Sequence, residues 1–383
     1  MTELQNLLNR AVAAQDLPFA VAMVATGHQI VFEGAAGDAA PGRPADLDTT
    51  FRIFSMTKGI GALAAMILID RGKLALDTPV ADILPAWGQL QVLDGFDGET
   101  PILRAPRTQA TIRHLATHTS GSEYPRWSDG MFRYAKAVGH PPIHSGLNSA
   151  LETAPLIFDP GTRWGYGLSS DWLGKVVEAV SGQSIVAFCQ TEIFDPLGMT
   201  STGFEVTQDM AGHLAQVNAR NPDGSFSLME LAPAPNPEFY AMGHALYSTA
   251  PDYLRFLRMI LNKGALDGVR LLSEPAVATM TADHMQGLAW SRLISKVPSQ
   301  SADFDPFPGT RLVHSLGFMR NQEDIPGKRS AGSQSWAGLL NTHYWIDPAR
   351  DIAAVLMTQS LPFVEARFMK TYDAFERTVY AEF

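Results

Sequence analysis

The stretch FSMTKG, residues 54–59, joins a short apolar run, FRIF at 51–54, to a long one, IGALAAMILI at 60–69. The first run is typical of a strand. The second places apolar residues at helical spacing, at Ile60, Leu63 and Ile67. The sequence therefore predicts a helix from Ser55 to about Leu74, with a serine and a lysine in its first turn.

Ser55 and Lys58 lie one helical turn apart. Residues three apart on a helix share a face, with Cβ atoms about 5–6 Å apart, so the Lys58 amine can reach the Ser55 hydroxyl. A serine becomes a nucleophile when a base takes its proton, and a lysine can act as that base when burial favours its neutral form. The Ser55 backbone N–H, unpaired in a first helical turn, can also donate to a developing oxyanion. A simpler interpretation is a capping serine and a solvated lysine, so the catalytic one depends on other segments.

Two other segments support the catalytic interpretation. PGTRWGYGLSSD, residues 160–171, presents Tyr166 just ahead of a predicted helix. A phenol beside a lysine ammonium has its anion stabilised, so Tyr166 can pass the serine proton to a leaving group. SQSWAGLLNTHYWIDP, residues 333–348, predicts an edge strand whose small residues Ala337 and Gly338 let a main-chain N–H complete an oxyanion hole. Taken alone, Tyr166 is more simply a core tyrosine, and residues 333–348 an aromatic-rich strand.

The pattern along the whole chain indicates an α+β fold. Strand-like segments occur near both ends, as hairpins over 18–38 and around the turn at 347–350, and helix signals fill the middle. The last segment, 363–380, has one apolar helical face. We therefore expect an antiparallel sheet built from N- and C-terminal strands and flanked by helices, with a mostly helical region inserted.

Composition excludes several classes of function. The net charge of -10 repels phosphate backbones and anionic membrane surfaces, so nucleic acid and membranes are poor partners. Cys189 is the only cysteine, which excludes disulfides within the chain and cysteine-rich metal sites, and no cofactor or metal is expected. The first residues lack the pattern of a signal peptide and no apolar run reaches the ~18 residues of a membrane span, so a cytoplasmic location is expected. The sequence leaves the oligomeric state open, and a homo-oligomer is compatible with it.

FSMTKG, WGYGLSSDWLG and SWAGLLNTHYWIDP, in this order, resemble the serine β-lactamase and penicillin-binding-protein superfamily, most closely the family VIII carboxylesterases related to class C β-lactamases. Auxiliary stretches such as TIRHLATHTSG and STAPDYLRF also look like signatures of that group. The resemblance implies a sheet-containing domain of residues 1–74 and 246–383, a mostly helical domain of residues 75–245, and an active site in the cleft between them.

The resemblance also implies roles for individual residues. Ser55 would be the acylated nucleophile, Lys58 its proton acceptor and Tyr166 the tyrosine of the second motif. Trp336-Ala337-Gly338 matches the third motif, and the following residue, Leu339, would donate the second oxyanion N–H alongside Ser55. The implied partner is a small-molecule ester.

Two departures from the β-lactamase pattern concern the substrate. Leu168 stands where β-lactamases usually have an asparagine, and Trp336 stands where they have the lysine of Lys-Thr-Gly. Both changes remove polar recognition of an anionic amide, in which a charge-assisted hydrogen bond contributes ~1.5–3 kcal/mol. A neutral ester with apolar parts is favoured, and the aromatic segments 123–136 and 303–309 would line its pocket or pack as lid or core. We expect His118 to be a structural, hydrogen-bonded histidine.

Other functions remain to be weighed. An α/β-hydrolase would need the nucleophile elbow Gly-x-Ser-x-Gly, which the chain lacks. GIGALA at 59–64 matches a dinucleotide-binding pattern, but its glycines begin inside the predicted helix, where close packing explains them better. A non-catalytic binding protein need not keep Ser55, Lys58 and Tyr166 together. A weak β-lactamase, a D-amino-acid peptidase or amidase, and an acyltransferase share the acyl-enzyme step and stay open.

Overall fold

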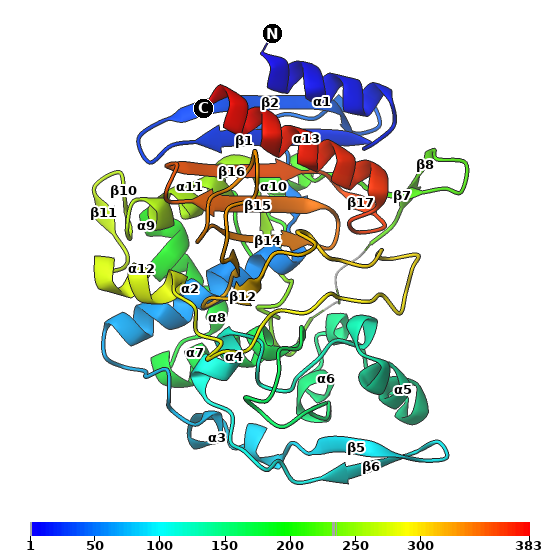
Figure 1. Ribbon diagram of the computed structural model, residues 1–383, viewed down its shortest axis with the longest axis vertical. Helices are drawn as coiled ribbons and strands as arrows, with labels where there is room; N and C mark the ends of the chain where they lie inside the picture. The colour runs from blue at the N-terminus through cyan, green and yellow to red at the C-terminus, as the bar shows by residue number, and fades with distance from the viewer. Residues whose placement is uncertain (1, 232–233, 235) are drawn as a thin grey trace.

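The computed structural model describes residues 2–231, 234 and 236–383, and within them an eight-stranded sheet is the largest element (Figure 1). Its strand order is β12-β13-β14-β15-β16-β1-β2-β3, and neighbours are antiparallel. N- and C-terminal strands thus meet at β1 and β16, as predicted. The strands are β1 (Phe19–Ala25), β2 (Ile30–Ala40), β3 (Arg43–Pro44), β12 (Leu312–His314), β13 (Met319–Asn321), β14 (Gln334–Gly338), β15 (Thr342–Asp347) and β16 (Ile352–Met357).

Helices lie on both faces of this sheet. The thirteen α-helices of the described residues are α1 (Glu3–Ala13), α2 (Thr57–Asp70), α3 (Val80–Ile83), α4 (Ile112–Ala116), α5 (Asp129–Val138), α6 (Ser149–Glu152), α7 (Ser169–Ser181), α8 (Ile185–Cys189), α9 (Asp195–Leu197), α10 (Gln208–His213), α11 (Ala250–Leu261), α12 (Glu274–Thr281) and α13 (Ala366–Glu382). Side chains alternate along β1, so Ala20, Ala22 and Val24 join the core under α1 and α13. Phe19, Val21 and Met23 join the core that contains α2 and α11.

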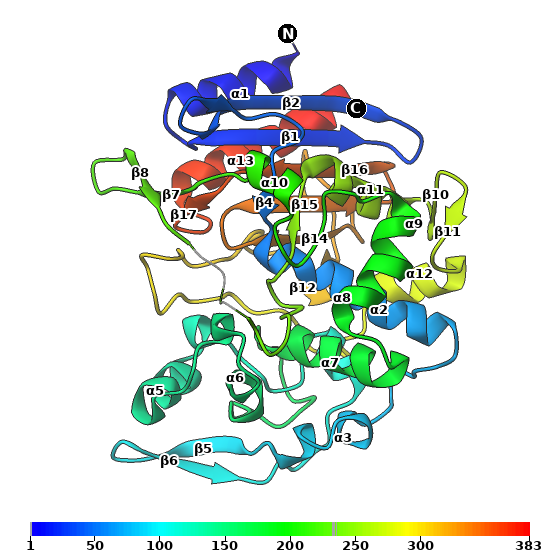
Figure 2. The same ribbon diagram turned by 180° about the vertical axis from the view of Figure 1, so that it is seen from behind.

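The remaining strands form small sheets. They are β4 (Phe51–Arg52) with β9 (Tyr247–Ser248), β5 (Val92–Asp97) with β6 (Thr100–Arg104), β10 (Ala265–Leu266) with β11 (Val269–Arg270), and β7 (Val217–Arg220) between β8 (Phe226–Met229) and β17 (Ser360–Leu361). The β5–β6 hairpin lies at the end of the molecule opposite both termini, as Figure 2 shows from behind. The fold is the expected α+β arrangement.

The central helix α2 is buried on every side, because α7 packs against it and the sheet core encloses the rest. The apolar spacing predicted the helix with one buried face. In the structure, all residues from Thr57 to Leu68 are buried. Gly59 and Gly61 make this packing possible, since an added Cβ would lie 3.2 Å from the Phe256 ring and 3.1 Å from Met242. The glycines therefore serve helix packing, as expected, rather than a nucleotide.

The prediction of one edge strand over residues 333–348 is wrong. The segment forms two strands, β14 and β15, and β14 lies inside the sheet between β13 and β15. The short β13 pairs with β14 only at Ser335 and Gln334, and β14 packs against residues 54–56, just before α2. A Cβ on Gly338 would meet the Ile53 carbonyl oxygen at 2.2 Å, which explains a glycine at this close approach.

Candidate active site

Ser55 lies in a 3₁₀ turn, η1 (Phe54–Met56), that leads directly into α2. The turn is held by β14, which packs against it, and Phe54 adopts a positive φ of 43°. Ser55 is half-buried, and the packing of β14 fixes its backbone. The sequence placed Ser55 in the first turn of the helix, and the structure places it one turn earlier.

Lys58 is in the first turn of α2 and only 2% of it is exposed. Its Nζ donates to Ser55 Oγ at 3.0 Å, to the Gly243 carbonyl at 2.7 Å and to Tyr124 Oη at 3.2 Å. The amine also lies 4.8 Å from the centre of the Tyr166 ring and 5.1 Å from that of Tyr124. The side chain is thus fixed against the serine oxygen and is not a solvated surface lysine.

Tyr166 enters from the turn that precedes α7. Its hydroxyl donates to Ser55 Oγ at 2.7 Å and accepts from Trp336 Nε1 at 3.1 Å. The structure therefore brings Ser55, Lys58, Tyr166 and Trp336 into one hydrogen-bonded group. The Trp336 indole binds the tyrosine itself, a contact that the sequence comparison with Lys-Thr-Gly did not predict.

Gly338 and Leu339 lie where β14 ends and the turn to β15 begins. Leu339 shares a small apolar cluster with Phe54, so the turn is next to the one that carries Ser55. Among the described residues, neither the Ser55 amide nor the Leu339 amide donates a hydrogen bond. Two unpaired backbone donors on adjacent turns are the arrangement that an oxyanion hole requires.

Tyr124 and Asp171 belong to the same group, and sequence reasoning missed both roles. Asp171 is 1% exposed, and its Oδ1 accepts from the Gly243 amide at 2.7 Å, so it orients the peptide whose carbonyl holds Lys58. A Cβ on Gly243 would lie 2.5 Å from Tyr124 Oη and 2.8 Å from Asp171 Oδ1, so only glycine fits. In the sequence, Asp171 is marked only as a charged residue shortly after Tyr166, and Tyr124 only as a tyrosine within an aromatic segment.

Burial controls the charges around this group. It raises the pKa of Asp171 to about 6, while Lys58, the Gly243 amide and Tyr124 act in the opposite direction. Burial, with Asp171 and Tyr166, raises the pKa of Tyr124 well above its ordinary value, so its phenol stays protonated.

The nearby histidines are held neutral. Burial, then His314 and Lys58, lowers the pKa of His118 well below its ordinary value. The His118 ring packs edge-on against Tyr166 at 5.1 Å, and its Nδ1 has no partner within the described residues, contrary to the expected hydrogen bond. Burial and Lys58 lower the pKa of His244 to about 3, with smaller contributions from His144 and Arg126. These rings pack beside the site without contacting Ser55 Oγ.

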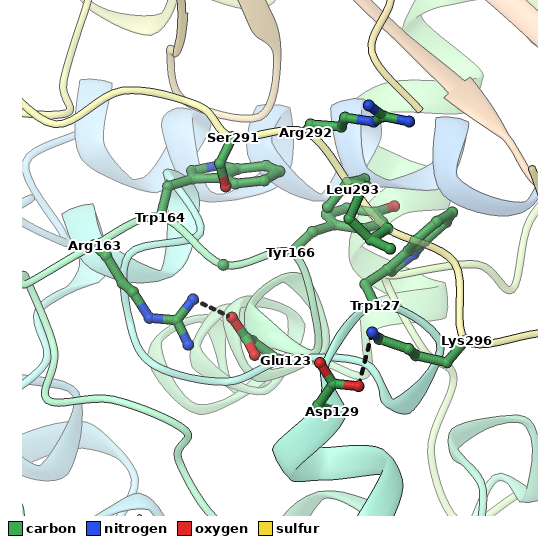
Figure 3. A pocket seen from close by; sticks show the side chains of 12 residues that line it. Glu123, Trp127, Asp129, Arg163, Trp164, Tyr166, Ser291, Arg292, Leu293 and Lys296 are labelled. Carbon is green, nitrogen blue, oxygen red and sulfur yellow. Dashed lines mark ion pairs between the residues drawn. The ribbon is translucent and has the colours of Figure 1, made fainter. Parts of the chain in front are cut away.

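A cavity of about 220 Å³ adjoins Tyr166 (Figure 3). Its walls include Trp127, Trp164 and Leu293, and its rim carries two ion pairs. These pairs join Arg163 to Glu123 at 2.9 Å and Lys296 to Asp129 at 2.7 Å.

A second cavity, of about 280 Å³, is mainly apolar and includes Leu168. Its other walls are Pro125, Met131, Phe132, Ala135, Lys136, His140, Pro141, Pro142, Ile143 and Ala150. Residues 123–136 thus contribute to both cavities. Phe304 and Phe307 of the segment 303–309 are buried, and Phe304 packs on Trp336 and Phe363, which corresponds to the core interpretation of that segment.

Within the described ranges, His, Cys, Asp and Glu side chains form no group of three placed to bind a metal ion. In the same part of the chain, none of the helices has the length and hydropathy needed to cross a membrane.

The chain is similar to known proteins along nearly its whole length. The family model described as Beta-lactamase matches residues 4–377. Lovastatin esterase of Penicillium rubens is 30% identical, over 94% of this chain and 90% of that protein. Monacolin J acid methylbutanoyltransferase of Aspergillus terreus is 31% identical, over 89% of this chain and 84% of that protein. The structure of unliganded simvastatin synthase from Aspergillus terreus has a TM-score of 0.86 at 26% identity, covering 100% of this chain and 98% of that chain.

Proposed function

The chain belongs to the β-lactamase family, and from this premise we propose that it cleaves carboxylic esters through an acyl-enzyme on Ser55, with Lys58 and Tyr166 as the proton-transfer pair. The observation that carries the proposal is that Ser55 Oγ lies 3.0 Å from Lys58 Nζ and 2.7 Å from Tyr166 Oη. Both groups are within the distance at which a proton can be transferred directly. The esterases and acyltransferases among its relatives share this type of serine hydrolase scaffold.

The proposed site would lie in a cleft between two parts of the chain. Ser55, Lys58 and Trp336 come from residues 1–74 and 246–383, which hold the main sheet, and Tyr124 and Tyr166 come from residues 75–245. Substrate would enter between the two parts.

In the acylation step, Ser55 Oγ attacks the ester carbonyl carbon and its proton passes to the Lys58–Tyr166 pair. The amides of Ser55 and Leu339 stabilise the negative charge that develops on the carbonyl oxygen. The bond to the alcohol then breaks, and the pair returns the proton to the departing oxygen, so that an acyl-serine and a free alcohol result. Water attacks the acyl-serine in the same way and releases the carboxylic acid.

The apolar cavity at Leu168 supports an ester with a short-to-medium acyl chain. Its volume of about 280 Å³ exceeds the roughly 150 Å³ of a protein cavity that holds benzene. Leu168 offers no hydrogen bond to an amide side chain, and Trp336 is engaged with Tyr166. We therefore place the acyl chain in this cavity and expect weak cleavage of β-lactams and of D-amino-acid amides.

Acyl transfer is the second candidate function. Simvastatin synthase superposes over the whole chain, and a relative is named a methylbutanoyltransferase. An alcohol in the cavity beside Tyr166 would then replace water in the second step. Adding an alcohol acceptor during turnover and measuring the ratio of new ester to free acid distinguishes transfer from hydrolysis.

A substrate panel tests the proposed function. We expect p-nitrophenyl butyrate and octanoate to be cleaved at least about 100-fold faster, in kcat/KM, than nitrocefin or a matched anilide, because the site lacks polar groups for the amide. Ala150→Phe should fill the cavity at Leu168 and reduce kcat/KM for octanoate by about tenfold, because one or two methylenes of the acyl chain lose their place. The kcat/KM for acetate should stay nearly unchanged. Preference for nitrocefin over every ester would contradict the proposal.

Activity should fall as the pH decreases through about 6. Above this pH Asp171 is ionised and accepts from the Gly243 amide, and below it the carboxyl becomes protonated because burial raises its pKa to about 6. In Asp171→Asn, which keeps an acceptor oxygen but does not titrate, this step in a plot of kcat/KM against pH should disappear. An unchanged acid limb in the variant would show that another group controls it.

The same shift has a consequence for stability. Since the pKa of Asp171 is raised in the folded state, its protonated form favours folding below the ordinary value of 3.8, and this contribution is lost as the pH rises through about 6. The melting temperature of Asp171→Asn relative to that of wild type should therefore be higher at pH 8 than at pH 3.5.

A further inference from the structure

Arg126 lies in the 3₁₀ turn η3 (Pro125–Trp127), which directly follows Tyr124. One of its nitrogens, Nη2, donates to the side-chain oxygen of Gln300. Nε is buried without a hydrogen-bond partner, and Nη1 has none either in the described part of the chain. Two of the three guanidinium nitrogens thus make no hydrogen bond to the described part of the chain.

The charge of Arg126 is also unpaired. None of the ion pairs among the described residues includes it, whereas the cations around the cavity at Tyr166 are all neutralised. Arg163 pairs with Glu123, Lys296 with Asp129, and Arg292 with Asp303. A partly buried cation without a carboxylate is costly to folding, and this cost favours a role in binding a group from outside the folded chain.

The position of Arg126 connects this charge to the reaction. Burial lowers the pKa of the guanidinium, and the hydroxyl groups of Tyr166 and Tyr124 act in the opposite direction. These are the two tyrosines whose oxygens contact Ser55 and Lys58. Arg126 also follows Tyr124 by two residues, and its chain neighbours Pro125 and Trp127 line the two cavities. An anionic group bound by Arg126 would therefore lie close to the ester bond.

Tethering of the neighbouring loop does not account for the charge. The Arg126 carbonyl accepts from the Lys296 amide at 2.9 Å, and the side chain contacts Gln300, so this turn does anchor residues 296–300. A backbone carbonyl needs no guanidinium, however, and a neutral side chain could donate the single bond to Gln300.

We propose that Arg126 binds a carboxylate of the substrate, so that the preferred esters carry a free carboxylate near the bond that is cleaved. The inference rests on the proposed ester chemistry and names its substrate class. It revises the expectation of a neutral ester: the cation that Trp336 replaces in the third motif is supplied from η3 instead. The carboxylate belongs to either the acyl or the alcohol side of the ester.

Two matched substrate pairs separate these sides. The acyl-side pair is p-nitrophenyl hydrogen glutarate and its methyl ester, and the alcohol-side pair is 4-acetoxybenzoate and its methyl ester. For at least one pair, wild type should show a higher kcat/KM for the carboxylate member. Arg126→Gln should lower the ratio of carboxylate to methyl ester by about tenfold or more, as expected for loss of a charge-assisted hydrogen bond. Arg126→Lys should restore part of it.

Arg133→Gln is the matched control, because Arg133 lies on α5 close to Arg126 in the chain, lines neither cavity and is paired with Glu99. It should leave the ratio unchanged. Calorimetric titration with glutarate and 4-hydroxybenzoate needs no turnover and should detect binding to wild type that Arg126→Gln loses. The inference would be overturned if wild type cleaved the carboxylate and methyl ester of both pairs with equal kcat/KM. It would also be overturned if Arg126→Gln left the carboxylate-to-ester ratio unaltered. Absence of cleavage of all four esters would instead refute the proposed function, and the titration would still decide whether Arg126 binds carboxylates.

Discussion

Ser55→Ala is expected to reduce kcat/KM for p-nitrophenyl butyrate by about 10⁴-fold or more, the scale observed when a covalent nucleophile is removed. The substitution deletes the one oxygen among the described residues that contacts both Lys58 Nζ and Tyr166 Oη. Removing a half-buried hydroxyl should hardly alter packing, so the loss should occur without a change in thermal unfolding. Initial rates at substrate concentrations well below KM measure it directly.

Ser299→Ala is the control for that experiment. Ser299 is exposed and lines neither cavity. Its activity should stay within about twofold of wild type, because surface substitutions rarely change more than a few tenths of a kcal/mol. A loss below about tenfold in Ser55→Ala, about 1.4 kcal/mol of barrier, would be too small for a nucleophile and would contradict its role.

Lys58→Met should lower kcat/KM by about 10³-fold, within the 10²–10⁴ range of positioned acid–base groups. Methionine keeps most of the side-chain length inside the buried first turn of α2 but cannot accept or donate a proton. The rate should not recover at high pH, since no titratable group replaces the amine. A profile of kcat/KM from pH 6 to 10 measures both effects.

Stability must be followed in the same variant. Lys58→Met leaves the Gly243 carbonyl and the Tyr124 hydroxyl without their donor, which costs about 1–3 kcal/mol for each group that stays buried and unpaired. Lys73→Met, an identical change at an exposed position just after α2, should leave both activity and thermal unfolding unchanged. Retention of more than a tenth of the activity in folded Lys58→Met would contradict the proton-transfer role.

The parts of the site that could be predicted from the sequence are those in which local geometry is decisive. Ser55 and Lys58 are three residues apart at the start of a helix, so helical geometry alone brings them together. Tyr166 and Trp336 were found through motif order. Their contact through the indole N–H depends on how β14 and the turn before α7 are placed, which local patterns do not encode.

Tyr124, Asp171 and Gly243 show what local patterns miss. They meet around one peptide that holds Lys58, although they come from three distant segments. Nothing in the residue spacing links them, because the link is made by burial of α7 against α2. Arg126 was likewise predicted only as part of an aromatic segment, and the lack of a carboxylate beside it is visible only in three dimensions.

For the fold, apolar runs on either side of turn residues predicted the two hairpins, and an apolar helical face predicted the final helix. The prediction for β14 was wrong because residues 339–341 form a tight turn inside what looked like one continuous strand, and because β13, too short to stand out, covers its outer side. The burial of α2 on all faces could not be predicted from its own periodicity, since the neighbours that cover it are α7 and the sheet.

Labelling of the protein with a fluorophosphonate, followed by intact mass and peptide mapping, tests the acyl-enzyme most directly. We predict one adduct per chain, on the peptide that contains Ser55, absent in Ser55→Ala and strongly slowed in Lys58→Met. An adduct on any other side chain, or labelling of Lys58→Met at the rate of wild type, would contradict nucleophilic catalysis by Ser55 with Lys58 as its base.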